Sequence, residues 1–506
     1  MPWGRSRAVA LWAVVCMAAM AALTGWAVSP PGSSPDDDYH LASIWCADGI
    51  VAGRCEAIED RPDARLLPRL ATGAAICYAL DNTVSGSCQK GMAAPDPDVD
   101  IEHGNWGGAY PPYFYSFLST FVGSDVQRAV LTMRLANAAL IVALVTLLAA
   151  LLPRRRRPLA VVPLVVTAVP LSMSILASIN PSSWAVVGAA LLWPALYVAF
   201  ETTGRRQWAL SGFAVLAAFI GSGSRADGCL FVLMSIALVL LLRVRHLRRA
   251  LVPSLAAGVG LVIAASIFLT SGHASAVTEG LGYTRIELTT TQLLLINLSS
   301  LPTLWFGMLG SGPMGRTGWL DTVYPPMVSA LGVATWFGLV LGGLRRMFPA
   351  KLVGLVLIGG ALVVYPMALL IGSHVLVGEG VQPRYLLPMM VIFTGLALLG
   401  VRGSLPRLGP RWYWAAVGAL GLAHTVALHI HIRRYVTGLD VSRILFGNDL
   451  EWWWGVGPSA TSVWLVSSIG FIVLSAAALR PLRADRDPRP GSAPAGSGAG
   501  RSSVTP

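Results

Sequence analysis

A series of long apolar runs constrains this chain more than any other feature of its sequence. About a dozen runs reach the length of about 20 residues that a helix needs to cross a membrane. Only 12% of the 506 residues are charged and 55% are hydrophobic, whereas soluble domains carry roughly 25% charged residues. We therefore expect an all-α polytopic membrane protein. The predicted transmembrane helices lie at about 8–28, 126–152, 159–177, 182–200, 208–223, 228–242, 250–270, 325–344, 352–372, 384–401, 412–431 and 459–479.

Basic residues between the apolar runs predict the orientation, because Lys and Arg collect on the cytoplasmic side of membrane proteins. Twelve crossings place every basic cluster on one side. We therefore expect a multi-pass protein of the inner (plasma) membrane with both termini in the cytoplasm. The apolar stretch 288–309 would break this pattern if it crossed, because Arg345, Arg346 and Lys351 would then lie outside. We predict a re-entrant or interfacial element there, with an extra span as the alternative.

The chain divides into four predicted parts. Residues 1–28 form a first transmembrane helix that acts as a signal anchor, and 29–125 form a large extracytoplasmic loop. Residues 126–480 form the helical bundle, and 481–506 are a disordered tail rich in Pro, Gly, Ala, Ser and Arg.

Charge is distributed unevenly between these parts. The outer loop holds 14 of the 25 acidic residues and five of the 37 basic ones, a net charge of about −9, so the remainder carries about +21. We expect the positive charge to face membrane lipid head groups and not nucleic acid.

Four of the six cysteines lie in the outer loop, an even number in an oxidising compartment. Three pairings are open, and we predict the nearest-neighbour one, which joins Cys46 to Cys55 and Cys77 to Cys88.

An acidic cluster follows the first apolar run. Asp36, Asp37, Asp38 and His40 lie within five positions. Carboxylates this close repel one another, so one can be poised as a general base. Together they could instead bind a divalent cation such as Mg²⁺ or Mn²⁺. The structural alternative is a solvated loop in which Asp36 caps a helix that begins near Tyr39.

Aromatic residues gather before the second run, where Tyr110, Tyr113 and Tyr115 surround two prolines. Such residues suit stacking on a sugar ring or packing against a polyprenyl chain, and they also fit an interfacial aromatic belt.

Two arginines lie at the outer ends of later runs. Arg384 has a planar guanidinium that suits bidentate phosphate binding. Its neighbours Gln382 and Tyr385 are further candidates for substrate binding. An ion pair with Glu379 or with a loop acid is the alternative. Arg225 is a second candidate, although Asp227 beside it could neutralise its charge.

The sequence also argues against two classes of transporter. No phosphate-binding glycine loop occurs in it, which disfavours ATP-driven transport by this chain alone. The transmembrane interiors, apart from residues such as Arg134 and Asn137 in the second run, are expected to be nearly free of charge. Proton- or ion-coupled transporters usually carry ionisable residues near the bilayer midplane.

Four motifs together resemble an uncharacterised bacterial family of polytopic membrane proteins, a domain of unknown function grouped with GT-C glycosyltransferases. Residues 35–40 resemble its Pro-Asp-Glu-x-x-His, and 110–115 its Pro-Pro-x-Tyr-Tyr. Residues 180–182 match its Asn-Pro-Ser turn, and 382–388 resemble its Gln-Gly-Arg-Tyr-x-x-Pro. Asp37 stands where the family has Glu, and Pro383 where it has Gly. The resemblance extends from about residue 30 to 400.

The resemblance implies a GT-C-like fold and a membrane glycosyltransferase that takes a sugar from a polyprenyl-phosphate donor. Asp36 or Asp37 would deprotonate an acceptor hydroxyl, with inversion at the sugar. Arg384, with Arg225, would stabilise the leaving polyprenyl phosphate, and His40 would orient the carboxylate or the acceptor. The resemblance leaves metal dependence open.

The expected acceptor is a cell-wall glycan, a lipoglycan or a protein. Two other functions stay open at this point. One is a non-catalytic, polyprenyl-lipid-binding protein of envelope assembly, and the other is a transporter of lipid-linked saccharides.

Overall fold

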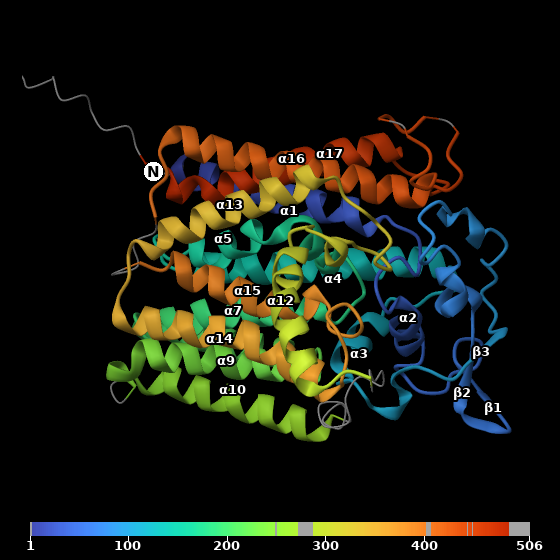
Figure 1. Cartoon of the computed structure of the whole chain (residues 1–506), viewed down its shortest axis with the longest axis horizontal. Helices are drawn as coiled ribbons and strands as arrows, with labels where there is room; N and C mark the ends of the chain where they lie inside the picture. The colour runs from blue at the N-terminus through green and yellow to red at the C-terminus, as the bar shows by residue number, and fades with distance from the viewer. Residues whose placement is uncertain are drawn as a thin grey trace, which may run out of the picture.

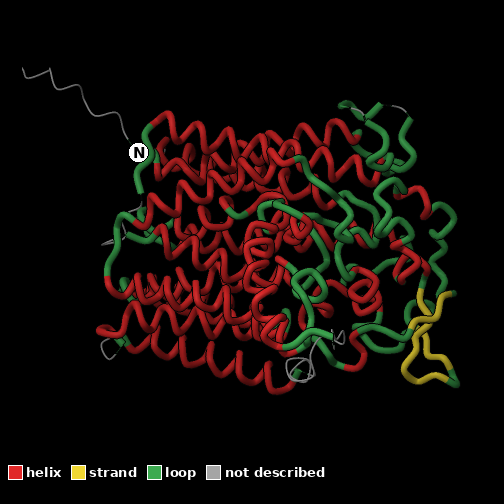
Figure 2. Tube along the Cα trace, viewed as in Figure 1, coloured by secondary structure: helices red, strands yellow, loops and turns green. Residues whose placement is uncertain are grey.

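The structure is a computed structural model that describes residues 3–247, 250–271, 287–400, 406–442, 444–447 and 449–484. Most of its long helices run side by side in one bundle, and segment 29–125 lies at one end of that bundle (Figure 1). Figure 2 shows the few strands in yellow at this same end. Residues 485–506 of the predicted disordered tail lie outside the described residues.

A helix, or a pair of helices, lies at each of the predicted apolar runs. These helices are α1 (Trp3–Ala27), α4 (Val126–Leu151), the pair α5 (Pro158–Val166) and α6 (Met173–Leu176), α7 (Ser182–Ala199), α8 (Gly204–Ser222), α9 (Ala226–Arg243), α10 (Leu251–Thr270), α13 (Pro326–Leu344), α14 (Pro349–Gly372), α15 (Pro383–Leu398), α16 (Pro410–Val436) and α17 (Ala460–Leu479). Proline is the first residue of five of them, α5, α13, α14, α15 and α16. Its fixed φ suits the first helical position, where no N–H is needed.

Nine helices in the described part of the chain are long and apolar enough to cross a membrane, or ten if the bent pair counts as one span. The protein is therefore a polytopic membrane protein. Two predicted spans do not reach that standard: α8 carries Arg205 and Arg206 in its first turn, and α15 has only 16 residues. The number of twelve spans stays a prediction.

The third predicted span is not one straight helix. It consists of α5 and a second helical stretch, Ala168–Leu176, and the two are bent by 101° relative to each other. The break lies at Val169, which has an extended backbone (φ −102°, ψ 133°) directly before Pro170. Proline disfavours the helical conformation of the residue that precedes it, so the sequence itself explains the break.

The stretch 288–309 forms α12 (Thr290–Gly307), which runs across the bundle helices instead of along them (Figure 1). Asn297 fixes it to the loop after α14, because its side chain donates to Val375 O and accepts from Val377 N–H, both at 2.9 Å. Its other face exposes leucines such as Leu295, which is 62% exposed. This arrangement fits an interfacial element.

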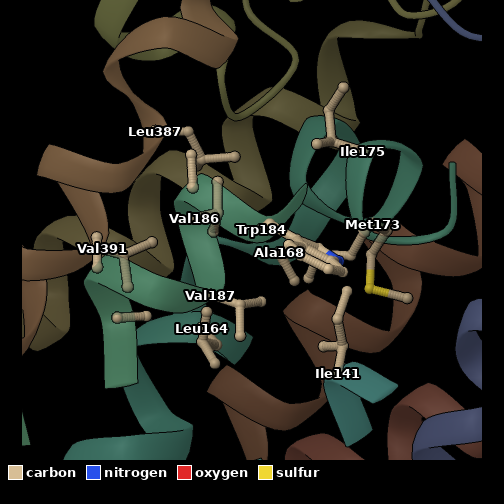
Figure 3. Close-up of a cluster of buried hydrophobic side chains, with 14 of the residues drawn as sticks. Ile141, Leu164, Ala168, Met173, Ile175, Trp184, Val186, Val187, Leu387 and Val391 are labelled. Atoms are coloured by element: carbon tan, nitrogen blue, oxygen red, sulfur yellow. The ribbon is translucent and has the colours of Figure 1, made fainter. Parts of the chain in front are cut away.

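The core of the bundle is built around α7, whose residues are all buried. Figure 3 shows its Trp184, Val186 and Val187 among side chains of α4, α5 and α15. Gly188 lets α8 approach closely, since a Cβ there would lie 2.4 Å from the Cα of Gly221. Small residues at such crossings are typical of membrane helix packing.

The outer loop 29–125 is a folded unit and not only helical, which corrects the all-α expectation locally. It contains α2 (Asp37–Trp45), α3 (Tyr113–Ser119) and a three-stranded antiparallel sheet of β1 (Glu56–Ile58), β2 (Arg61–Leu67) and β3 (Val99–Ile101), in the order β1-β2-β3. Ala64 and Leu67 of β2 are buried against the loop core.

Both predicted disulfides are present in this unit. Cys46 pairs with Cys55 and Cys77 with Cys88, with Cα–Cα distances of 5.4 and 6.1 Å. These pairings confirm the nearest-neighbour prediction.

The transmembrane interior carries more ionisable side chains than we predicted. Among the described residues, six buried ones lie in the helices at these runs, namely Arg134 of α4, Lys351 of α14, Arg384 of α15, and His424, His431 and Arg434 of α16. Each long cationic side chain has hydrogen-bond partners: Lys351, for example, donates to the carbonyls of Gly343 and Ala397 at 2.9 and 2.7 Å. Buried charges need such partners in an apolar surrounding.

Candidate active site

The acidic motif lies where α1 ends and α2 begins, and it turns its first carboxylate toward α15. Asp36 has a left-handed backbone (φ 60°, ψ 21°) directly before α2. Aspartate tolerates this conformation better than most residues. Asp36 Oδ2 accepts from Arg384 Nη2 at 2.5 Å. The two predicted residues, 348 positions apart in sequence, therefore meet.

This ion pair is asymmetric in exposure. The Asp36 side chain is 40% exposed, whereas the Arg384 side chain is 2% exposed. The N–H groups on Nε and Nη1 of Arg384 are buried and have no protein partner. Buried polar groups are usually hydrogen-bonded, so Arg384 has two unsatisfied donors, which a ligand can reach only if the site opens.

The electrostatics of Asp36 depend on Arg384. Burial raises the pKa of the Asp36 carboxyl, but Arg384, with smaller contributions from His40 and Arg225, outweighs burial and holds that pKa below its ordinary value. Asp36 is consequently ionised at neutral pH.

Asp37, the next residue, points into the protein. It is fully buried, and its Oδ2 lies 3.3 Å from Nη2 of Arg134 and accepts the Ser34 N–H at 3.0 Å. Burial, opposed by Arg134 and by the Ser34 N–H, raises the pKa of Asp37 to about 6. A carboxylate in this position holds the motif in place and has no access to an acceptor from outside.

Arg134 also ties the preceding segment to α4. It donates to the carbonyls of Ser29 and Pro30, at 2.5 and 3.1 Å, and to the Ser33 hydroxyl at 2.9 Å. The chain between α1 and α2 is therefore fixed over its whole length.

The Asn-Pro-Ser turn supports the same segment from another side. Asn180 is buried, and its Nδ2 donates to Pro35 O at 2.9 Å. Its Oδ1 accepts the Ser182 N–H at 2.9 Å. Ser182 in turn accepts from Arg225 Nη1 at 3.3 Å. This turn thus positions both the residue before Asp36 and the second predicted arginine.

Arg225 lies in the same cluster but is neutralised. Its Nε and Nη2 form a bidentate pair with Asp227 at 2.9 and 3.2 Å, as the sequence alternative allowed. Its guanidinium also lies 4.7 Å from the ring centroid of Tyr385 and 5.8 Å from that of Tyr110. Arg225 therefore links two predicted substrate-binding tyrosines, while Arg384 carries the donors without partners.

His40 lies deeper than Asp36. Its Nδ1 is 3.0 Å from the Tyr115 hydroxyl, and its Nε2 is buried without a protein partner. Burial, only partly offset by Asp36, lowers the pKa of His40 to about 3. The imidazole is thus neutral and is suited to hydrogen bonding but not to proton donation as a cation.

The predicted aromatic residues divide into two groups. Tyr110 and Tyr385 are partly exposed and flank Arg225, and the Tyr39 ring lies 5.5 Å from that of Tyr110. Tyr115 is buried, and its hydroxyl lies 3.0 Å from Nδ1 of His40. Tyr113 is 41% exposed and packs on Phe219 of α8, with ring centroids 4.8 Å apart.

Gln382 lines a small cavity of about 10 Å³ together with Pro35, Met314 and Arg384. It therefore borders the cluster at the N-terminus of α15.

The three consecutive carboxylates do not converge on a cation. Asp36 faces Arg384, Asp37 faces Arg134, and Asp38 lies 3.5 Å from Nε2 of His103. Among the residues that the structure describes, no group of three His, Cys, Asp or Glu side chains is placed to hold a metal ion. The acidic run therefore does not fit the predicted Mg²⁺ or Mn²⁺ site.

A comparison with protein families identifies the chain at the family level. A family described as a predicted membrane protein (DUF2142) matches residues 20–393. The chain belongs to this family. Asp36, Arg225 and Arg384 all lie inside the DUF2142 segment, whereas α16 and α17 lie beyond it. No curated protein and no solved structure matches the chain.

The buried ion pair between Asp321 and Arg434 was not predicted. Asp321, in the loop between α12 and α13, accepts from Arg434 Nη2 at 2.8 Å. Arg434 also donates to Tyr78 O and Val84 O at 2.6 and 2.5 Å, so it clamps the Cys77–Cys88 region to α16. The signal for it in the sequence is a charged residue at the end of an apolar run, which is also typical of interfacial residues.

Proposed function

We propose that this chain is a GT-C-type membrane glycosyltransferase that transfers a sugar from a polyprenyl-phosphate donor to an envelope acceptor on the extracytoplasmic face. The contact between Asp36 and Arg384 carries the proposal. It combines a partly exposed carboxylate with a buried guanidinium that has donors to spare. Inverting transfer needs these two groups, a base for the acceptor and a cation for the departing phosphate.

Arg384 is the principal phosphate ligand in this proposal. A guanidinium matches phosphate oxygens in a bidentate geometry, and Nε and Nη1 of Arg384 are unpartnered. Arg225 contributes less because Asp227 already occupies its bidentate edge. It acts mainly by holding Tyr110 and Tyr385 in position.

Donor binding would activate the base. The Arg384 guanidinium is the main group that lowers the pKa of Asp36 against the effect of burial. When a phosphate competes for Arg384, that stabilisation weakens and the Asp36 pKa rises. Asp36 is therefore a stronger base when the donor is bound than when the donor site is empty.

In the transfer step, Asp36 accepts the proton of the acceptor hydroxyl as its oxygen bonds to the anomeric carbon. The bond between that carbon and the phosphate oxygen breaks, and its electron pair goes to the phosphate, which Arg384 stabilises. Attack from the face opposite the phosphate inverts the configuration. Tyr39, Tyr110 and Tyr385 provide ring faces and hydroxyls suited to a sugar.

His40 and Asp37 have supporting roles in this mechanism. Neutral His40 offers Nε2 as a hydrogen-bonding atom next to the acid, with its ring fixed by Tyr115. Asp37 anchors the motif through Arg134. Acceptor candidates are a cell-wall glycan, a lipoglycan or a protein in the envelope outside the inner membrane.

The experiment compares envelope glycans of a deletion strain complemented with the wild type, Asp36→Asn or Asp38→Asn. Asp38 is the matched control, because it is adjacent and acidic but faces His103. We expect Asp36→Asn to lower transfer at least about 100-fold, as for the loss of a general base. Asp38→Asn should restore the wild-type profile.

Purified protein and a panel of radiolabelled polyprenyl-phosphate monosaccharides distinguish the alternatives. A non-catalytic lipid-binding protein would bind the panel through Arg384 without turnover. A transporter would move label across vesicles and tolerate Asp36→Asn. Full complementation by Asp36→Asn would overturn the catalytic proposal.

A further inference from the structure

A second candidate site is built from residues that do not belong to the Asp36 cluster. An apolar cavity of about 110 Å³ opens between α1, α4, α5 and α17, lined by side chains such as Val15, Val145 and Phe471. Figure 3 shows Ile141 and Leu164, which also line it. The cavity wall is almost entirely hydrocarbon, apart from Cys16 and Thr146, which bond to each other.

This cavity continues into a wider groove of about 760 Å³ that reaches the basic end of the molecule. The two share five wall residues, which are Trp12, Val15, Ala149, Val161 and Leu474. The mouth of the groove is lined by four arginines, Arg154, Arg157, Arg480 and Arg483. The combined space is therefore apolar at depth and cationic at its mouth.

The arginines at the mouth carry uncompensated charge. Within the described residues, no carboxylate forms an ion pair with any of the four, whereas neighbouring Arg156 pairs with Glu201 at 2.5 Å. Arg157 lies over Trp12, with its guanidinium carbon 5.2 Å from the ring centroid. Burial, with repulsion from Arg154 and Arg206, lowers the pKa of Arg157. An anion at this position would relieve that repulsion.

The position of the groove also indicates where its ligand comes from. Its wall includes α1, a peripheral helix. Only 22% of the membrane-spanning part of α1 is buried. A ligand can therefore enter sideways from the bilayer, with a charged head at the membrane surface and hydrocarbon in the cavity.

We propose that this groove binds an anionic glycerophospholipid from the leaflet at the basic end. Its phosphate lies among Arg154, Arg157 and Arg480, and an acyl chain occupies the cavity between α1 and α4. Basic pockets between transmembrane helices bind anionic head groups by this combination of charge and hydrocarbon contact. The site is separate from the Asp36 cluster and does not depend on the function proposed for it.

The test uses native mass spectrometry of the purified full-length protein, delipidated in detergent and titrated with dioleoyl phosphatidylglycerol. Phosphatidylcholine with the same chains is the lipid control. Arg154→Gln combined with Arg480→Gln should weaken phosphatidylglycerol binding at least about tenfold. Arg155→Gln combined with Arg205→Gln removes equal charge from exposed arginines that do not line the groove. This control should change binding less than about twofold.

A second variant tests whether the groove binds a whole lipid or only a free anion. Ala19→Phe fills the cavity without changing charge, since Ala19 lines it. It should weaken phosphatidylglycerol binding by a similar factor, and glycerol 3-phosphate should not compete in the wild type. Equal binding of phosphatidylcholine, equal loss in both arginine pairs, or competition by glycerol 3-phosphate would overturn the proposal.

Discussion

Asp36 and Asp37 are adjacent in sequence, but their carboxylates face different arginines. The left-handed conformation of Asp36 directs its side chain toward Arg384, and α2 then starts with Asp37 directed at Arg134. The sequence could indicate that both carboxylates belong to one motif. It could not show that the two carboxylates point in different directions, because each faces an arginine from a helix that is distant in sequence.

The pH dependence of transfer follows from the Asp36–Arg384 pair. In the proposed mechanism the deprotonated form of Asp36 is the active one, so transfer should fall as the pH falls through its pKa. In the free protein Arg384 holds that pKa below its ordinary value, so kcat/KM should begin to fall only at a lower pH than an ordinary aspartate would give. In the donor complex the pKa is higher, so the acid limb of kcat should lie at higher pH.

Steady-state transfer rates measured across pH in the wild type and in Arg384→Gln check this expectation. Arg384→Gln removes the cation that lowers the Asp36 pKa. The kcat/KM of this variant should therefore begin to fall at a higher pH than that of the wild type. Superimposable acid limbs in the two proteins would contradict it.

Stability should respond more to Asp37 than to Asp36. Asp37→Asn leaves the buried Arg134 without its carboxylate, and breaking a buried pair in this way costs roughly 3 kcal/mol. Asp36→Asn also removes the carboxylate of a buried arginine, but it should cost less, because the Asp36 side chain is 40% exposed and water screens its contact with Arg384. Thermal unfolding of the purified variants in detergent gives the comparison. Equal losses in the two variants would refute the division of roles.

At the scale of elements, the apolar runs predicted where the helices of the bundle lie, because bilayer length and hydropathy set them directly. The nearest-neighbour disulfides were also predictable. The sheet in the outer loop was not, since β1 and β3 have three residues each and no clear alternation. The bend at Val169 was readable from Pro170 but was not predicted. The buried residues of α16 follow only from tertiary contacts, as the clamp by Arg434 shows.

The orientation of α12 can be tested by labelling from one side of the membrane. Thr291→Cys and Arg316→Cys lie before and after most of the helix, and both positions are exposed. If α12 is interfacial, a membrane-impermeant maleimide should label both from the same side. Arg205→Cys, at the basic end, should react only from the other side. Labelling of Thr291→Cys and Arg316→Cys from opposite sides would show that α12 crosses.

At the scale of the whole molecule, the two ends of the bundle differ in charge. The outer loop is acidic, whereas Arg154, Arg480 and the first residues of α1 lie at the opposite end. Both described ends of the chain therefore lie on one side of the bundle, as twelve crossings require. The charge rule predicts that this side is cytoplasmic.

Reporter fusions can show whether α8 and α15, the two helices below the length or hydropathy expected of a span, cross the membrane. Alkaline phosphatase, active only outside the cytoplasm, should be inactive after Thr202 and active after Gly223 if α8 crosses. For α15, it should be active after Gly380 and inactive after Leu408. A fusion after Gly91, in the outer loop, serves as the positive control. Equal activity on both sides of either helix would reduce the number of spans.

The meeting of Asp36 with Arg384 also has a consequence for biogenesis. The two residues are 348 positions apart, and at roughly 5–20 residues per second the ribosome needs about 20–70 s to synthesise the chain between them. Throughout that time the first outer loop is present without its guanidinium partner. If the proposed function holds, a nascent chain that has not yet inserted α15 cannot transfer sugar, so the catalytic site forms late in membrane insertion.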